Sequence, residues 1–225
     1  NQMFCYIIYK KFLLQGKNVY IDIKDTYKSH NGYELDRIFD IKTRKMDIEK
    51  SVYFSDSSSK ILDRLRRRLF GRRKTFLQEK SEFKCDESIF DIDEDKYLNG
   101  YWQSIKYLNC IEENVRKDFT FKYSLDDRNL KILNLIKSNN SISIHIRRGD
   151  YLQGNNKNIY GNIATIEYYH KAMRIIAEKI QNPVYFVFSN DIGWVKENIE
   201  FKNEAIYIDW NSGKESYKDM QLMSN

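Results

Sequence analysis

SISIHIRRGD, the stretch at residues 141–150, passes from an apolar run into two arginines, a glycine and an aspartate. Its first six residues, Ser141–Ile146, are rich in β-branched isoleucine and predict a strand. Val184–Ser189 is nearly all apolar and predicts the central strand of a parallel sheet, because such strands are buried on both faces. Ala205–Ile208 predicts a third strand.

Helical patterns separate these three strands. Residues 166–180 predict a helix that Thr165 caps, and a second helix is expected to begin after Asn190 or Asp191. Strands and helices that alternate with short connections are typical of a right-handed, doubly wound layer. The second half of the chain is therefore predicted to be an α/β domain.

The first half of the chain is more polar and less regular. Residues 2–15 predict a buried helix that ends at Gly16, and Val19–Ile23 predicts a short strand. A helix followed by a strand suggests a further strand before Asn1, which the chain lacks. Two more helices are expected at residues 104–117 and 127–138, and a domain boundary near residues 137–141 divides the chain into 1–138 and 139–225.

The composition is that of a globular protein. The 225 residues are 41% hydrophobic and 31% charged, and no apolar run is long enough to cross a membrane as a helix. The three cysteines are far apart and show no paired metal-ligand spacing, which favours a reducing compartment and argues against a disulfide framework.

The positive charge of the chain is concentrated in one segment. Residues 60–74 carry a net charge of +7, whereas the whole chain carries +6. Leucines and an isoleucine recur there at spacings of three and four, the pattern of an amphipathic helix. Three interpretations remain open: a surface helix whose leucines face the core, a helix that docks on an anionic membrane, or a nucleic-acid-binding patch.

Two predicted strands end in polar residues. Ligands of open parallel sheets bind at the carboxyl ends of the strands, where Arg147 and Arg148 follow one strand and Asp191 follows another. A guanidinium offers a planar fork that matches phosphate oxygens, so the arginine pair predicts a clamp for a diphosphate. The alternative is that these arginines pair with nearby acidic side chains.

His145 and Asp191 also have two interpretations each. Asp191 can accept two hydrogen bonds from a guanine base, or it can cap the helix that follows it. His145 can orient a phosphate, a ribose or a base, or it can be a hydrogen-bonded core histidine. The acidic run Asp91–Asp95 resembles the paired acids that hold Mg²⁺ on a nucleotide-sugar, but such spacing is common in acidic loops, and no metal is expected.

Five segments together carry a resemblance to a known family. They are NQMF at residues 1–4, NGYELD at 31–36, GYWQS at 100–104, HIRRGDY at 145–151, and FSND at 188–191 with WVKEN at 194–198. In this order they resemble the bacterial alpha-1,2-fucosyltransferases. The HxRRGDY string is highly specific and the others are moderately so.

This resemblance implies an inverting glycosyltransferase of the GT-B type, with two Rossmann-like domains that face a cleft. The donor would be GDP-L-fucose and no metal would be required. The acceptor would be the 2-hydroxyl of a terminal galactose on an oligosaccharide, or on a glycolipid such as an O-antigen precursor. Residues 1–138 would form the acceptor-side domain and residues 139–225 an incomplete GDP-fucose-binding domain.

The resemblance also assigns roles to individual residues. Arg147 and Arg148 would bind the donor diphosphate and Asn1 the donor sugar or phosphate, and His145 and Asp191 would contact the guanosine by looser analogy. Asp150 and Glu167 are candidates for the carboxylate that takes the proton from the acceptor hydroxyl. The alternative role for Asp150 is to support the two arginines. Acceptor contacts are expected around residues 31–37 and 100–106.

Departures from the family pattern are visible at several places. The glycine-rich turn expected before Asn1 is missing, Cys5 replaces a usual glutamine, and Ile105 replaces a usual glutamate. The family continues beyond the point where Asn225 ends this chain, so a fragment that lacks both ends is expected. The expected location is the cytoplasm, with peripheral attachment to the inner face of the bacterial membrane. The competing function is a non-catalytic nucleic-acid-binding or membrane-surface module built on Arg64–Lys74.

Overall fold

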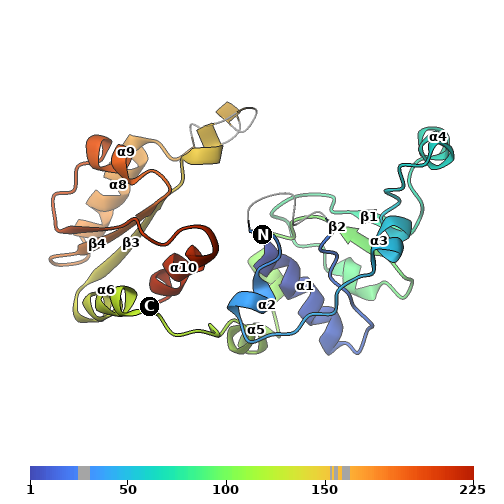
Figure 1. Cartoon of the computed structure of the whole chain (residues 1–225), viewed down its shortest axis with the longest axis horizontal. Coiled ribbons are helices and arrows are strands. Elements are labelled where there is room, and N and C mark those ends of the chain that lie inside the picture. The colour runs from blue at the N-terminus through green and yellow to red at the C-terminus, as the bar shows by residue number, and fades with distance from the viewer. Residues whose placement is uncertain (25–30, 153, 155–156, 159–162) are drawn as a thin grey trace. The chain divides into compact units, whose positions relative to one another are not determined.

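The structure is a computed structural model that describes residues 1–24, 31–152, 154, 157–158 and 163–225. It is a mixed α/β structure with two small parallel sheets (Figure 1). The chain forms two compact units, Asn1–Tyr123 and Ser124–Asn225, which we describe separately.

The second unit is built on a parallel sheet of three strands. The strands are β3 (Ser141–Ile146), β4 (Val184–Ser189) and β5 (Ala205–Ile208), in that order across the sheet. The connecting helices are α8 (Ile166–Ala177) and α9 (Ile192–Asn198). All three predicted strands are confirmed, and the strand with the most apolar sequence is indeed the central one.

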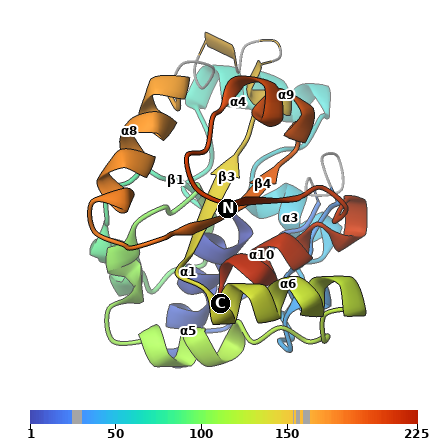
Figure 2. The ribbon, with the colours of Figure 1, turned by 90° about the vertical axis from the view of Figure 1, so that its left-hand side faces the viewer.

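Helices cover both faces of this sheet. One core cluster combines Val184, Phe186 and Phe188 of β4 with residues of α6 (Asp127–Ser138) and α10 (Tyr217–Met223). The other combines Tyr185 and Val187 with residues of α8 and α9 (Figure 2). Alternate β4 side chains thus enter two different cores, which explains why almost every position of the strand is apolar.

The division between the units falls before α6 and not at residues 138–139, where the sequence placed a domain boundary. The reason lies in packing, because Ile132 and Ile136 of α6 are buried against Val184 and Phe186 of β4. α6 itself has the bounds that the helical pattern at residues 127–138 predicted, and Asp126 is its N-cap.

The first unit consists mainly of short elements around one long helix, α1 (Gln2–Leu14), with a parallel pair of strands, β1 (Phe76–Gln78) and β2 (Tyr97–Asn99). The other elements in the described part of this unit are short helices, namely α2 (Leu35–Ile38), α3 (Ile48–Phe54), α4 (Ile61–Phe70), η2 (Glu87–Asp91), η3 (Ile105–Leu108) and α5 (Glu112–Asp118). The core packs Ile7, Ile8 and Phe12 of α1 against Trp102 and Tyr107.

Local predictions for this unit were partly right. The helix at residues 2–15 is confirmed as α1, and Gly16 follows it with a φ of +77°, a conformation that glycine adopts without strain. Residues 104–117 do not form one helix, because Cys110 takes a φ of +69° between η3 and α5. Val19–Ile23 does not form a strand, and within it Ile21 makes an isolated bridge to Lys45.

Two further helices, η4 (Gly149–Leu152) and η5 (Gly213–Glu215), complete the second unit's described elements. The predicted caps are present there: Thr165 Oγ1 accepts the backbone N–H of Tyr168 at 3.3 Å, and Asp191 Oδ1 accepts that of Trp194 at 3.2 Å. Among the described residues, no helix combines the length and the apolar character needed to cross a membrane.

Removing the side chain of Asp126 is expected to destabilise the second unit in a pH-dependent way. Asp126 Oδ1 accepts the N–H of Asn129 at 3.0 Å, and Lys218 donates to Oδ2 at 2.8 Å. The Lys218 hydrogen bond, followed by the helix cap, lowers the pKa of Asp126 below its usual range. Asp126→Ala should cost about 1 kcal/mol at neutral pH, the usual worth of a helix cap.

The sign of this pH dependence follows from the lowered pKa. The stabilisation is complete above the unfolded-state pKa of about 4 and is lost as the pH falls toward the lower folded-state value. Urea unfolding at pH 7 and pH 3 measures it, with the neighbouring variant Asp127→Ala as control. A difference between Asp126→Ala and the wild type that does not shrink at pH 3 would contradict the assignment.

Candidate functional site

The carboxyl ends of β3 and β4 lie side by side in the second unit. Ile146 at the end of β3 pairs with Ser189 at the end of β4, so the polar residues that follow both strands meet at one edge. Arg147 and Arg148 leave β3 there, and Asn190 and Asp191 leave β4. The juxtaposition that the sequence predicted for these residues is therefore present.

Two hydrogen bonds and one cation–π contact join Arg148 to residues that follow β4. Its backbone N–H donates to Asn190 Oδ1 at 3.0 Å, and its Nε donates to Asp191 Oδ2 at 3.2 Å. Its guanidinium carbon lies 3.4 Å from the centroid of the Trp194 ring, a cation–π contact. Two of the interpretations that the sequence left open are therefore observed. Arg148 pairs with a nearby carboxylate, and Asp191 caps α9.

Arg147 has different surroundings from Arg148. Its side chain is exposed, and its guanidinium carbon lies 4.7 Å from the centroid of the Tyr151 ring. Exposure at the end of β3 leaves a permanent positive charge in reach of an anion that approaches this edge of the sheet. The strand end therefore presents one arginine paired with Asp191 and a second one that is exposed beside Tyr151.

His145 precedes the arginine pair on β3. It is an exposed side chain and not a core histidine. Partial desolvation of its ring, followed by the charge of Arg147, lowers the pKa of His145. A lowered pKa keeps the imidazole neutral at physiological pH, so that it can both donate and accept a hydrogen bond.

His145 also lines a cavity of about 510 Å³ beside β3. The other lining residues come from β3, from α8 and from the segment before α8, and include Ser143, Tyr168, Tyr169 and Met173. Aromatic and apolar side chains with a few polar groups are typical of pockets for small molecules. The sequence identified His145 but not this aromatic wall of α8.

Gly149→Ala is expected to weaken the binding of an anionic ligand at this edge about tenfold, an effect of roughly 1.4 kcal/mol. A Cβ atom at Gly149 would lie 2.4 Å from Asn190 Nδ2, so the amide that holds the backbone of Arg148 would have to move. Titration calorimetry with GDP measures the loss. Gly193→Ala is the matched control, because a Cβ atom there meets no atom within 4 Å. Equal affinities of the two variants would contradict the role of Asn190.

Asp150 and Glu167 are the two carboxylates that the sequence offered as proton acceptors, and the structure describes the side chain of Glu167 but not that of Asp150. Asp150 belongs to η4, and its side chain lies outside the described part of the structure. Glu167 is exposed in the first turn of α8. Hydrogen bonds from its own backbone N–H and from Thr165 lower the pKa of Glu167, which makes this carboxylate a weaker base.

In the first unit, three distant segments meet at the start of α1. Gln2 Nε2 donates to the carbonyl oxygen of Gly32 at 2.7 Å, and Gln2 Oε1 accepts the N–H of Glu34 at 2.9 Å. Gln103 donates to the side-chain oxygen of Asn1. Residues 31–37 and 100–106, both expected to contact an acceptor, are thus brought together around Asn1 and Gln2.

Glu79 supports this arrangement and was missed by sequence reasoning. Its Oε2 accepts the backbone N–H groups of Tyr101 at 2.7 Å and Trp102 at 3.1 Å. Trp102 is buried with a φ of +56°, and Gly100 leaves no room for a Cβ atom, which would lie 2.5 Å from Glu79. No local pattern marks Glu79, because its partners lie more than twenty residues away.

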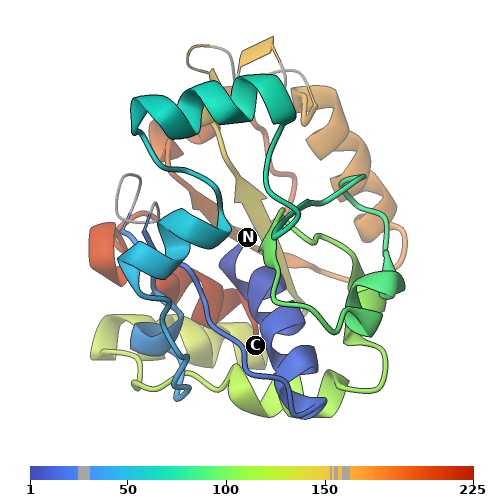
Figure 3. The same cartoon turned by 90° about the vertical axis from the view of Figure 1, so that its right-hand side faces the viewer.

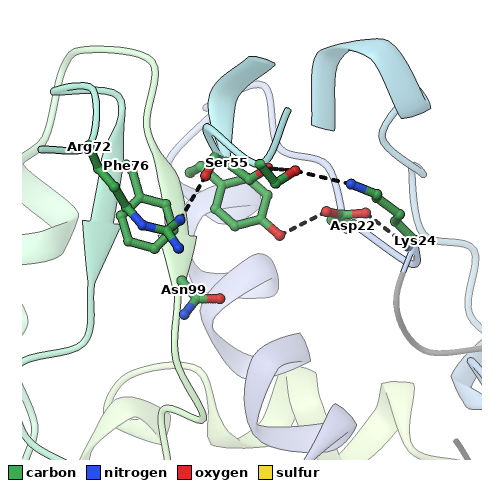
Figure 4. A pocket seen from close by; sticks show the side chains of 8 residues that line it. Asp22, Lys24, Ser55, Arg72, Phe76 and Asn99 are labelled. Carbon is green, nitrogen blue, oxygen red and sulfur yellow. Dashed lines mark hydrogen bonds between the residues drawn. The ribbon is translucent and has the colours of Figure 1, made fainter. Parts of the chain in front are cut away.

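The first unit also contains a small polar cavity of about 160 Å³. Figure 4 shows Asp22 and Lys24 on one side of it, Arg72 and Phe76 with Asn99 below them on the other, and Ser55 in between. Asp22 Oδ2 accepts the hydroxyl of Tyr97 at 2.7 Å. The guanidinium carbon of Arg72 lies 4.0 Å from the centroid of the Phe76 ring. Of these residues, the sequence singled out Arg72 alone, as part of the basic segment Arg64–Lys74.

The acidic run Asp91–Asp95 makes ion pairs with lysines. Asp93 Oδ1 lies 3.3 Å from Lys17 Nζ, and Glu94 Oε2 lies 2.8 Å from Lys96 Nζ. Within the residues that the structure describes, no group of three His, Cys, Asp or Glu side chains is placed to hold a metal ion.

Comparison with known proteins gives one family and several relatives. The model of glycosyl transferase family 11 matches residues 76–225. An alpha-1,2-colitosyltransferase of Escherichia coli is 30% identical over all of this chain and 77% of its own length. The galactoside alpha-(1,2)-fucosyltransferase 1 proteins of Saimiri boliviensis boliviensis and Leontocebus fuscicollis are 27% and 26% identical over 56% of this chain.

These relatives are longer than the chain. The chain covers about three quarters of the bacterial relative, but only 37% of the two primate relatives. No solved structure matches the chain.

Proposed function

The chain belongs to glycosyl transferase family 11, and from that membership we propose that it serves an inverting transfer of L-fucose from GDP-fucose. The proposed acceptor is the 2-hydroxyl of a terminal galactose on an oligosaccharide or glycolipid precursor. The observation that carries the proposal is the pair of polar strand ends, where Arg147 and Arg148 meet Asn190 and Asp191.

We assign donor binding to the second unit and acceptor binding to the first, and we propose the GT-B type for the enzyme. The assignment is supported by the general rule that parallel α/β sheets bind ligands at the carboxyl ends of their strands. The edge of β3 and β4 offers cationic groups for a nucleoside diphosphate. The cluster around Asn1, Gln2 and Gln103 offers amides, which suit the hydroxyl groups of a sugar.

In the proposed reaction, fucose leaves GDP while negative charge builds on the β-phosphate. The exposed guanidinium of Arg147 stabilises that charge where it develops. Arg148 binds the diphosphate from a position set by Asn190, Asp191 and Trp194, so it needs little reorganisation on binding. Neutral His145, beside the cavity along α8, contacts the guanosine together with Asp191.

The acceptor hydroxyl attacks the opposite face of the sugar and loses its proton to a carboxylate. Asp150 is the proposed acceptor of this proton. Glu167 is the weaker candidate, because hydrogen bonds already lower its pKa.

Titration calorimetry with GDP and GDP-fucose, beside ADP and UDP, tests the donor assignment. Selective binding of GDP in the presence of EDTA, lost in Arg147→Ala, is the expected result. Equal binding of all three diphosphates would contradict a guanosine site, and binding abolished by EDTA would contradict a metal-free clamp. A parallel titration with GDP-colitose distinguishes the proposed donor from the sugar named for the bacterial relative.

A further inference from the structure

The helix α4 turns its apolar side chains outward. Ile61 and Leu62 are both 81% exposed, Leu65 is 53% exposed and Leu69 is 66% exposed. These four residues lie on one stripe, because Ile61 and Leu62 precede Leu65 by four and three residues and Leu69 follows it by four. The interpretation that the leucines of this segment face the core is therefore wrong.

Charged residues of α4 face the body of the first unit instead. Asp63, Arg66 and Arg67 are the residues of the helix that are partly covered. Arg67 Nη2 donates to the carbonyl oxygen of Ser58 at 2.7 Å, and Arg66 Nη1 donates to that of Gly71 at 3.2 Å. This orientation is the reverse of that of an ordinary surface helix, which buries its apolar stripe.

Asp56 fixes this reversed orientation. Its side chain is only 2% exposed, it pairs with Arg66, and it accepts the backbone N–H of Arg73 at 3.1 Å. Arg67 and Arg73 contribute further nitrogens at 3.8 and 3.7 Å. Burial alone would raise the pKa of Asp56, but these hydrogen bonds outweigh it and keep the pKa below its usual range. The carboxylate thus stays charged and holds the polar side of α4 inward.

Two exposed basic residues border the outward stripe along one side. Arg64 and Arg68 are exposed beside it, and Phe70 at the end of the helix is 81% exposed. Figures 1 and 3 show α4 at the margin of the first unit, away from α1. An apolar stripe with exposed arginines along its side suits the boundary of an anionic lipid bilayer, where leucines enter the acyl region and guanidinium groups meet phosphates.

We propose that the outward face of α4, made by Ile61, Leu62, Leu65 and Leu69 with Arg64 and Arg68 along one side, docks the protein on an anionic membrane surface. The helix lies in the plane of the interface and does not cross the bilayer. This inference stands apart from the proposed transfer reaction, since it uses no residue of the donor or acceptor sites. A duplex nucleic acid is a poorer match, because it offers nothing apolar for the leucines to contact.

Co-sedimentation of the whole chain with vesicles tests the proposal. Binding is expected with equimolar phosphatidylcholine and phosphatidylglycerol, and it should be weak with phosphatidylcholine alone. The variant Arg64→Gln/Arg68→Gln should bind about 30-fold more weakly, from the usual contribution of each basic residue near an anionic bilayer. The variant Leu62→Ser/Leu65→Ser should lose at least about tenfold.

Ile48→Ser is the matched control for the apolar substitutions, because Ile48 is 71% exposed on another helix of the same unit. It should bind vesicles as the wild type does. All substituted side chains are exposed, so each variant is expected to fold as the wild type does. Circular dichroism spectra of the variants check this.

Three results would overturn the proposal. The first is equal binding to neutral and anionic vesicles, and the second is undiminished binding by Leu62→Ser/Leu65→Ser. The third is a wild-type protein that does not bind vesicles. In that case, a dimer that Leu62→Ser/Leu65→Ser converts to a monomer in light scattering would assign the face to a second copy of the chain, and binding of random duplex DNA would assign it to nucleic acid. GDP calorimetry remains independent of all three, so this inference and the proposed function can fail separately.

Discussion

Arg147→Ala is expected to reduce the turnover of fucosyl transfer about 10²–10³-fold, as the loss of one preorganised transition-state donor does. The reason is the position of Arg147. Its exposed side chain directly follows the end of β3, where the departing diphosphate of the proposed reaction gains negative charge. Arg147→Lys should also fail, because an ammonium cannot replace the planar fork of a guanidinium. Single-turnover rates with GDP-fucose and a galactoside, in the longest active form of the protein, measure both variants.

The control for this experiment is Arg174→Ala. Arg174 is an exposed arginine in the last turn of α8, in the same unit but outside the lining of the cavity beside β3. Its removal should leave the rate unchanged. An Arg147→Lys enzyme with a rate near that of the wild type would remove Arg147 from the proposed mechanism, whatever its effect on GDP affinity.

Asn129→Ala is expected to lower the free energy of unfolding of the second unit by about 3 kcal/mol, because it leaves several polar groups without partners. Asn129 is fully buried in α6. Its Oδ1 accepts from Trp210 Nε1 at 3.1 Å and from Asn211 Nδ2 at 3.0 Å, and its Nδ2 donates to Asp126 Oδ2 at 2.9 Å. The variant removes all of these contacts at once.

Urea unfolding, followed by tryptophan fluorescence, measures this effect, since two of the three tryptophans, Trp194 and Trp210, lie in the second unit. Asn134→Ala is the matched control, since Asn134 is an exposed asparagine of the same helix, and its replacement should change stability by less than about 0.5 kcal/mol. Similar losses for the two variants would show that the Asn129 network contributes nothing beyond helix propensity.

The sequence by itself predicted the elements whose signals are local. The three strands of the second unit were predictable because β-branched and apolar runs of this length have few alternatives, and parallel pairing follows from the helices between them. The ends of α1 and the caps Thr165 and Asp191 were predictable for the same reason, since a cap and its partner lie within three residues. The meeting of Arg148 with Asp191 also followed from parallel strand order.

Only the tertiary structure decided features that join distant parts of the chain. The periodicity of residues 61–70 predicted a helix with an apolar stripe, but it could not tell which side faces the protein, because Asp56 decides that through Arg66, ten residues away. Glu79 and Asn129 bear no local signature, since their roles come from backbone groups and side chains more than twenty and eighty residues away. A periodic pattern records what a segment could bury, whereas burial itself depends on which other segments fold against it.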